Sequence, residues 1–321
     1  MEINLIDNVR TTCRAVVERA DNVRINEDSI NSYAHSLPLQ NAITPELDAH
    51  VHYLGHAEDT LAFFLILDSI NFGSGYFPHL QKRSGMSGYF TIASSLNDYF
   101  NAHGPFSVRQ LQDLTVEDCA KIFNQDLNNP PVKELMRLFS QALTDLGRYL
   151  LEGFDGRYDN LVSAANASVN RLVELLTKMP YFNDVEQYDN LIVAFYKRAQ
   201  LTAADLALAF DGTGWGYFSD LDRLTIFADN LVPHVLRVDN ILIYEKSLLD
   251  RINAGEPIAE GSKEEIEIRA CAVHAVELIK QNLQQAGHRI TSSGLDYLLW
   301  NRGQQPDYKA KPRHRTKTVF Y

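Results

Sequence analysis

The sequence predicts a mostly α-helical protein with at most a small β-sheet. Three observations support this fold class: apolar residues recur at helical spacing in several long segments, helix-capping patterns precede some of them, and few runs are typical of strands. The 321-residue chain can bury a large core, and its 45% hydrophobic and 22% charged residues are ordinary for a globular protein. We expect a single domain over residues 1–321. It could consist of two closely packed helical subdomains, the N-terminal and C-terminal halves, with a ligand between them.

The first half of the chain contains most of the clear helix signals. Apolar periodicity and a capping box at Thr115 predict helices over residues 3–19, 56–70, 115–123, 132–153 and 160–179. The segment 56–70 is too long for one strand, so we expect a buried helix there. Pro45 after Thr44 is typical of a further helix start.

The second half is predicted to contain three more helices. The first covers residues 196–210; the second begins at a capping Ser219 and ends before Pro233, because a residue preceding proline disfavours the helical conformation. The third begins with a capping box at Ser262 and stops at Gly287. The candidate strands are residues 86–92, 191–195 and 316–321.

The charge and the cysteines exclude several classes of protein. The formal net charge of −11 argues against a large nucleic-acid surface, because the phosphate backbone favours a positive protein. Three widely spaced cysteines without a CxxC pattern predict neither a disulfide scaffold nor a structural zinc site, and they favour a reducing compartment such as the cytoplasm. No apolar run approaches the roughly 20 residues that cross a bilayer, and the acidic N-terminus predicts no signal peptide.

Residues 195–233 carry the clearest chemical signal. Two predicted helices flank a turn rich in glycine and aromatic residues at 211–218, and they offer Lys197 and Asp229. Each charge is placed at the end of its predicted helix that the helix dipole disfavours, by about 0.3–1 kcal/mol. This favours a partner or a ligand that holds both side chains there, although an exposed lysine and an exposed aspartate remain the alternative.

A second group of residues could bind a flat heterocycle. Asp68 and Asn71 follow the apolar segment, and a carboxylate can accept two N–H bonds from a guanine-like edge. Phe72 and Tyr89 could provide aromatic faces. The alternative is a helix end with local hydrogen bonds and aromatic residues in the core.

The histidines and the basic tail give weaker signals. His52 and His56 are four residues apart and could share a metal ion with His50, but the sequence lacks the HExxH order. The acidic chain ends in a basic stretch at 309–317, which suits a small anionic ligand better than a long polyanion.

Several sequence blocks resemble the queuosine salvage protein family. In the order of that family they are DSINF at 68–72, SGYF at 87–90, FYKRAQ at 195–200, FAD at 227–229, EIRAC at 267–271, LDYLLW at 295–300, and HR at 314–315 followed by FY at 320–321. The FYKRAQ and FAD blocks are the strongest, and the blocks extend over nearly the whole chain.

The resemblance implies a helical fold related to DNA glycosylases and a hydrolase without cofactor or metal. It implies cleavage of the N-glycosidic bond of queuosine 5′-phosphate, which releases queuine and ribose 5-phosphate. On this basis we expect Asp229 to act as the carboxylate on the sugar side and Lys197 to orient Asp229 or to contact the ribose or phosphate.

The remaining roles follow from the same resemblance. Asp68 and Asn71 would hold the base, with Phe72, Tyr89 or Phe227 stacking on it. The 5′-phosphate would contact the tail residues Arg313, His314 and Arg315, since guanidinium groups suit its geometry.

Two other readings of the sequence remain open. A non-catalytic helical module could bind a modified nucleotide or a tRNA segment through the basic tail, although the net charge disfavours it. A metal hydrolase would use His50, His52 and His56.

Overall fold

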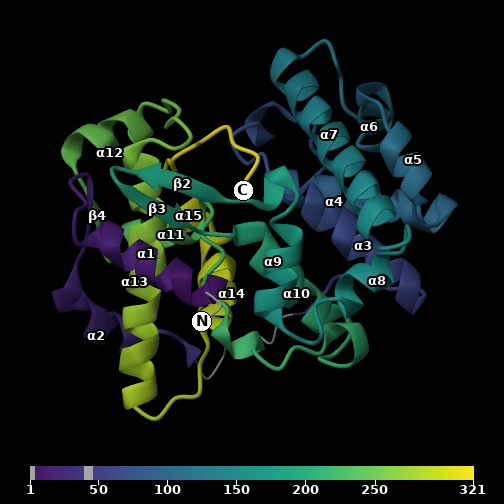
Figure 1. Cartoon of the computed structure of the whole chain (residues 1–321). Coiled ribbons are helices and arrows are strands. Elements are labelled where there is room, and N and C mark those ends of the chain that lie inside the picture. The colour runs from purple at the N-terminus through teal and green to yellow at the C-terminus, as the bar shows by residue number, and fades with distance from the viewer. Residues whose placement is uncertain (1–3, 40–45) are drawn as a thin grey trace. The chain divides into compact units, whose positions relative to one another are not determined.

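The computed structural model describes residues 4–39 and 46–321, and most of them are helical (Figure 1). The helices are α1 Leu5–Val17, α2 Glu27–Ser36, α3 Ala57–Ser69, α4 Gly88–His103, α5 Val108–Asp113, α6 Val116–Ile122, α7 Pro130–Gly153, α8 Tyr158–Ser163, α9 Val169–Leu176, α10 Lys197–Ala209, α11 Val232–Val238, α12 Lys246–Asn253, α13 Lys263–Gln285, α14 Ser292–Gly303 and α15 Pro306–Lys309. The predicted mostly α fold is confirmed.

Two short antiparallel sheets of two strands each are the β-structure of the described residues. Strand β1, Val23–Ile25, pairs with β4, Leu242–Tyr244, and strand β2, Val185–Tyr188, pairs with β3, Leu191–Ala194. The predicted strand at 191–195 is therefore confirmed.

Contacts divide the chain into two compact units whose segments alternate along the sequence. Unit 1 comprises residues 1–45, 184–200 and 220–317, and unit 2 comprises residues 46–183, 201–219 and 318–321. The units therefore do not correspond to the N-terminal and C-terminal halves that we expected as subdomains. Helix α10 begins in unit 1 and continues in unit 2.

Helix α13 is the central element of unit 1. It is buried along most of its length, and α1 and α2 pack against it (Figure 1). The side chain of Ser262 accepts a hydrogen bond from the backbone N–H of Glu265, as its capping pattern predicts, and Gly287 follows the helix with a φ of +90°. The first turns of this helix carry three charged side chains into the core: Glu265, Glu267 and Arg269.

Unit 2 contains α7, which is the longest helix of the described residues. Helix α7 packs against α5, α6 and α3 (Figure 1). Helix α3 is buried from Thr60 to Ser69, which confirms the expected buried helix. Thr115 and Asp118 form the predicted capping box of α6.

Several predicted elements differ from the structure. The predicted strand at 86–92 is mostly the first turn of α4, because the Ser87 side chain accepts a hydrogen bond from the Phe90 N–H and starts a helix. The helix predicted over 160–179 is interrupted between α8 and α9, where Asn166 and Ala167 have positive φ angles. Residues 316–321 form no strand, although side chains alternate between buried and exposed from His314 to Thr318.

The predicted helix starts at Ser219 and Thr44 also differ. Only a short 3-10 turn, Leu221–Arg223, follows Ser219. The start at Thr44-Pro45 lies outside the described residues, and Glu46 after it is not helical. No helix in residues 4–39 and 46–321 is both long and apolar enough to cross a membrane.

Candidate active site

Lys197 lies at the junction between strand β3 and helix α10. Tyr196, just before it, has a φ of +49°, which turns the chain sharply from strand to helix. The Lys197 N–H donates to Oδ2 of Asp184 at 3.1 Å, so this carboxylate caps the start of α10. The Lys197 residue is only 6% exposed. The predicted position of this lysine in the first turn of a helix is confirmed.

Asp229 precedes a helix, whereas the sequence analysis placed it near the end of one. Its Oδ1 accepts hydrogen bonds from the N–H groups of Leu231 at 2.6 Å and Val232 at 3.3 Å. Pro233 lies in the first turn of α11, where proline fits because the first N–H groups of a helix have no partner within it. The helix dipole therefore favours the Asp229 carboxylate, which reverses our electrostatic argument for this residue.

Asp296, in helix α14, is a candidate residue that the sequence analysis missed. Its Oδ1 accepts a hydrogen bond from the Phe227 N–H at 2.8 Å. Burial raises the pKa of Asp296 to about 8; Asp229 also raises it, whereas the Phe227 hydrogen bond and Lys197 lower it. Asp296 thus lies within reach of the charges of both Asp229 and Lys197.

The spacing of α14 contains a signal for Asp296. The buried residues of the helix are Ser292, Leu295, Asp296, Leu299 and Gly303, which is the spacing of a core-facing stripe. An aspartate in such a stripe must be paired or protonated, because an isolated buried charge is costly. The signal was readable from the positions of Leu295 and Leu299.

The basic tail brings one of its predicted phosphate ligands near Asp229. Arg313 and Arg315 are exposed. Neighbouring protein atoms partly shield the Arg313 guanidinium from water, which lowers its pKa, while the charge of Asp229 raises it and that of Arg315 lowers it. Arg237 of α11 anchors the tail by donating to the Pro312 carbonyl at 2.6 Å.

His314 differs from the expected phosphate contact. It is only 2% exposed, and burial lowers its pKa to about 3, with Arg313 and His234 acting in the same direction. A neutral, enclosed imidazole cannot contribute a positive charge to a phosphate site. The alternation of the tail points His314 inward and its two arginine neighbours outward.

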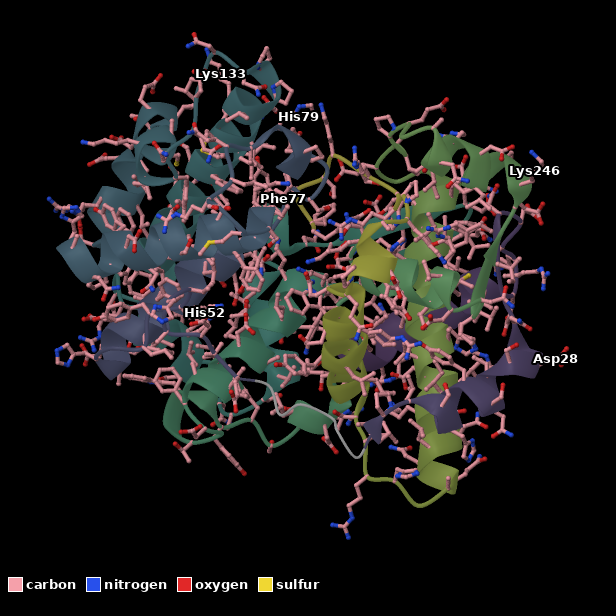
Figure 2. All side chains as sticks on the ribbon, turned by 180° about the vertical axis from the view of Figure 1, so that it is seen from behind. Asp28, His52, Phe77, His79, Lys133 and Lys246 are labelled. Carbon is pink, nitrogen blue, oxygen red and sulfur yellow. The ribbon has the colours of Figure 1, made fainter. Side chains whose placement is uncertain are left out.

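Unit 2 brings Asp68 and Tyr89 together. Burial raises the pKa of the Tyr89 phenol, and the charges of Asp205 and Asp68 raise it further. His52, within unit 2 (Figure 2), has Nε2 3.0 Å from the Tyr89 hydroxyl, and burial lowers its pKa. His52 and Asp205 were not predicted as partners of this group.

Phe72 and Asn71 have different surroundings from each other. The Phe72 residue is 1% exposed, and its ring packs edge-on against Phe139 and Tyr181, with centroids at 5.2 Å and 5.9 Å. This burial argues against the expected stacking of Phe72 on a base. Asn71 is partly exposed after the end of α3.

Comparison with known proteins identifies the family. A family profile described as queuosine salvage protein matches residues 51–321. The chain belongs to the queuosine salvage protein family. It is 36% identical to the queuosine 5′-phosphate N-glycosylase/hydrolase of Sphaerobacter thermophilus, over 98% of this chain and 97% of that protein. The proteins of the same name from Mus musculus and Dictyostelium discoideum are each 30% identical, over 97% and 99% of this chain and 98% and 100% of the relatives.

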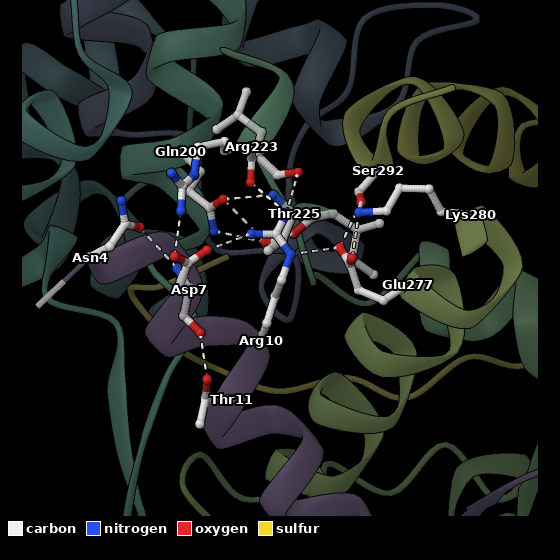
Figure 3. Close-up of polar contacts among 12 residues, drawn as sticks. Asn4, Asp7, Arg10, Thr11, Gln200, Arg223, Thr225, Glu277, Lys280 and Ser292 are labelled. Carbon is white, nitrogen blue, oxygen red and sulfur yellow. Dashed lines mark hydrogen bonds and ion pairs between the residues drawn. The ribbon is translucent and has the colours of Figure 1, made fainter. Parts of the chain in front are cut away.

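Gln200, the last residue of the FYKRAQ block, connects the start of α10 to the segment that precedes Asp229. The Gln200 side chain donates from Nε2 to Thr225 Oγ1 at 2.9 Å, and its Oε1 accepts from the Thr225 N–H at 3.0 Å (Figure 3). The neighbouring carbonyls of Arg223 and Leu224 accept hydrogen bonds from Arg10 of α1. The start of α10 and the segment leading to Asp229 are therefore joined by buried hydrogen bonds.

A further network in this unit supports the same segment (Figure 3). Arg10 pairs with Glu277 of α13 at 3.2 Å, and Glu277 also contacts Lys280 and accepts from the Ser292 hydroxyl at 2.6 Å. Burial alone raises the pKa of Glu277, but these partners outweigh it and lower the pKa below its usual value. Helices α1, α13 and α14 are thus linked around the residues that lead to Asp229.

The histidines of the metal alternative do not form a ligand set. Within residues 4–39 and 46–321, no group of three His, Cys, Asp or Glu side chains could hold a metal ion. His52 instead packs on Phe64, with ring centroids 5.9 Å apart, and contacts Tyr89.

Proposed function

We propose that this protein hydrolyses the N-glycosidic bond of queuosine 5′-phosphate and releases queuine and ribose 5-phosphate. The observation that carries the proposal is the group formed by Asp229, Asp296 and Lys197 in a chain whose relatives bear the name of this activity. The direct test is to incubate the pure protein with queuosine 5′-phosphate and with queuosine and to measure free queuine by mass spectrometry. Absence of queuine with both substrates would reject the proposal.

Asp229 is the carboxylate that faces the sugar. Cleavage of an N-glycoside develops positive charge on C1′ and the ring oxygen, and a fixed carboxylate stabilises that charge. The N–H groups of Leu231 and Val232 hold Oδ1 of this carboxylate in place. Asp229 either activates a water molecule or attacks C1′ itself, and both routes require the ionised form.

Lys197 orients Asp229 or contacts the ribose or the phosphate. A buried ammonium group is costly unless carboxylates or other acceptors balance it. The charge of Lys197 lowers the pKa of Asp296, which places this lysine near the Asp296 carboxyl group.

Asp296 assists departure of the base. Queuine is a 7-deazaguanine, so it lacks the N7 atom at which purines are usually protonated. With a pKa of about 8, Asp296 is largely protonated at neutral pH and can donate a hydrogen bond. A carboxyl group that its surroundings keep neutral at this pH can serve as the acid in such a reaction.

Asp68, Tyr89 and Asn71 are the proposed residues of unit 2 for binding the base. Asp68 can accept N–H bonds from a guanine-like edge, and the Tyr89 hydroxyl adds a further polar group beside it. Tyr89 and Phe227 are the remaining candidates for stacking, because Phe72 is enclosed in the core of unit 2.

Arg313 and Arg315 bind the 5′-phosphate. We predict that changing both to glutamine raises KM for queuosine 5′-phosphate by about 10-fold or more, because a hydrogen bond between charged groups contributes about 1.5–3 kcal/mol. KM for queuosine, which lacks the phosphate, should change little. Steady-state kinetics on both substrates measures this, with Lys311→Gln as a control on the same exposed tail. Equal losses for nucleotide and nucleoside would reject the phosphate assignment.

Hydrolysis at this site needs water alone. We predict that prolonged treatment with a chelator leaves the turnover of queuosine 5′-phosphate unchanged, measured as queuine released per minute. A loss of turnover that added divalent metal restores would contradict this prediction. It would support the alternative of a metal hydrolase that uses His50, His52 and His56.

We place the protein in the cytoplasm as a single domain acting on a small nucleotide. Cys13, Cys119 and Cys271 are buried free thiols, and burial raises the pKa of each, so they are in the unreactive thiol form. This pattern suits a reducing compartment.

A further inference from the structure

A buried arginine contacts the two segments that carry Lys197 and Asp229. Arg269, in α13, is completely buried. Its Nε donates to the carbonyl of Ala228 at 3.0 Å, and Ala228 directly precedes Asp229. Its two terminal nitrogens donate to the two oxygens of Asp184, at 2.9 Å and 2.6 Å.

Asp184 extends these contacts to the other segment. Its Oδ2 accepts the N–H of Lys197, and its backbone carbonyl accepts the N–H groups of Phe195 at 3.0 Å and Tyr196 at 3.3 Å. The guanidinium of Arg269 also lies 3.9 Å from the centroid of the Phe195 ring. One ion pair thus fixes the start of α10 on one side and the residue before Asp229 on the other.

Stability alone is a weak reason for such a pair. Burying an arginine and an aspartate carries a desolvation cost that apolar residues of similar volume would avoid. Glu265, only 1% exposed, places a second carboxylate 3.6 Å from Arg269, which adds a further buried charge to the cluster. The bonds to Ala228 and Lys197 need a planar, forked donor together with a carboxylate, which apolar residues cannot replace.

We infer that Asp184 and Arg269 form a positioning pair that sets the placement of Lys197 relative to Asp229. The inference rests on the proposed function, because it assigns these two residues a role in that reaction. Neither side chain acts on substrate; both act through the backbone of the catalytic segments. Small displacements of catalytic groups are expensive, since a shift of about 1 Å can cost about 100-fold in rate.

The test uses Arg269→Lys and Asp184→Asn in the full-length protein. Lysine keeps the charge but cannot bond Asp184 and Ala228 together, and asparagine keeps an acceptor for Lys197 but loses the ion pair. We expect kcat for queuosine 5′-phosphate to fall about 10- to 100-fold, while KM changes less than about 3-fold. The matched control is Leu283→Ala, a buried substitution at the far end of the same helix. It should lower the melting temperature and leave kcat of the folded fraction unchanged.

A second readout does not depend on activity. Hydrogen–deuterium exchange at the amides of Lys197 and Leu231 should accelerate at least about 10-fold in Arg269→Lys and stay at the native rate in Leu283→Ala. If Arg269→Lys does not fold, Asp184→Asn alone is the test variant: exchange at the amides of Lys197 and Leu231 should accelerate in Asp184→Asn and stay at the native rate in Leu283→Ala.

The two failures are distinguishable. A native protein that releases no queuine would reject the proposed function, while exchange would still report on positioning. Native kcat in folded Arg269→Lys and Asp184→Asn, or unchanged exchange at Lys197 and Leu231, would overturn the positioning pair.

Discussion

Replacement of Asp229 by asparagine should reduce the release of queuine about 1,000-fold or more while the protein stays folded and binds queuosine 5′-phosphate. Asparagine keeps an oxygen that can accept the N–H bonds of Leu231 and Val232, so the start of α11 is preserved. It removes the negative charge that stabilises the oxocarbenium-like transition state. Single-turnover release of queuine, with binding measured by calorimetry, separates the two effects.

Asp222→Asn is the matched control for this variant. Asp222 is an exposed aspartate in the same unit, in the short turn before the segment that leads to Asp229. The Asp222→Asn variant should release queuine at the native rate. Retained turnover in Asp229→Asn would remove this residue from the mechanism, and lost binding would assign it to substrate affinity.

Replacement of Asp296 by asparagine should change how stability depends on pH. The carboxyl has an ordinary pKa of 3.8 in the unfolded chain and about 8 in the folded protein. Between these values the folded state holds a proton that the unfolded state has lost, so this group reduces stability as pH rises from about 4 to about 8. Asparagine cannot titrate and removes this dependence.

The expected size of the effect is large for a single residue. From about pH 4 to pH 8, the unfolding free energy of Asp296→Asn relative to the native protein should rise by on the order of 4 kcal/mol. Denaturant unfolding at several pH values measures this difference. A constant difference across the range would show that Asp296 ionises normally.

The same variant tests the proposed role of Asp296 as a hydrogen-bond donor. In the native protein, kcat/KM should decline as pH rises through about 8, because the donor loses its proton. In Asp296→Asn this decline should disappear and the rate should be lower at every pH. Persistence of the decline would assign it to another group.

Local signals in the sequence were sufficient for much of the fold. The apolar segment at 56–70 and the caps at Thr115 and Ser262 predict α3, α6 and α13 because their causes lie within a few residues. The helix predicted from Ser219 to Pro233 is wrong: only a short 3-10 turn follows Ser219, and Pro233 lies in the first turn of the next helix.

The candidate site was only partly predictable for a similar reason. Lys197 and Asp229 stand in recognisable blocks, but their support comes from residues far away in sequence. Asp184, Arg269 and Asp296 are joined to these blocks by tertiary hydrogen bonds that no spacing rule contains. The burial of Phe72 and His314 likewise depends on helices and loops that pack over them.

The alternation of the two units along the chain has a consequence during synthesis on the ribosome. Residues 46–183 emerge early, but the N–H groups of Gly73 and Ser74 must wait for the carbonyl oxygen of Tyr321, which accepts from both. The N–H of Ile258 similarly waits for the carbonyl of Arg315. Neither unit can form all of its hydrogen bonds before residues 315–321 have been translated. The backbone N–H groups that these residues bind therefore have no protein partner while the chain is being synthesised.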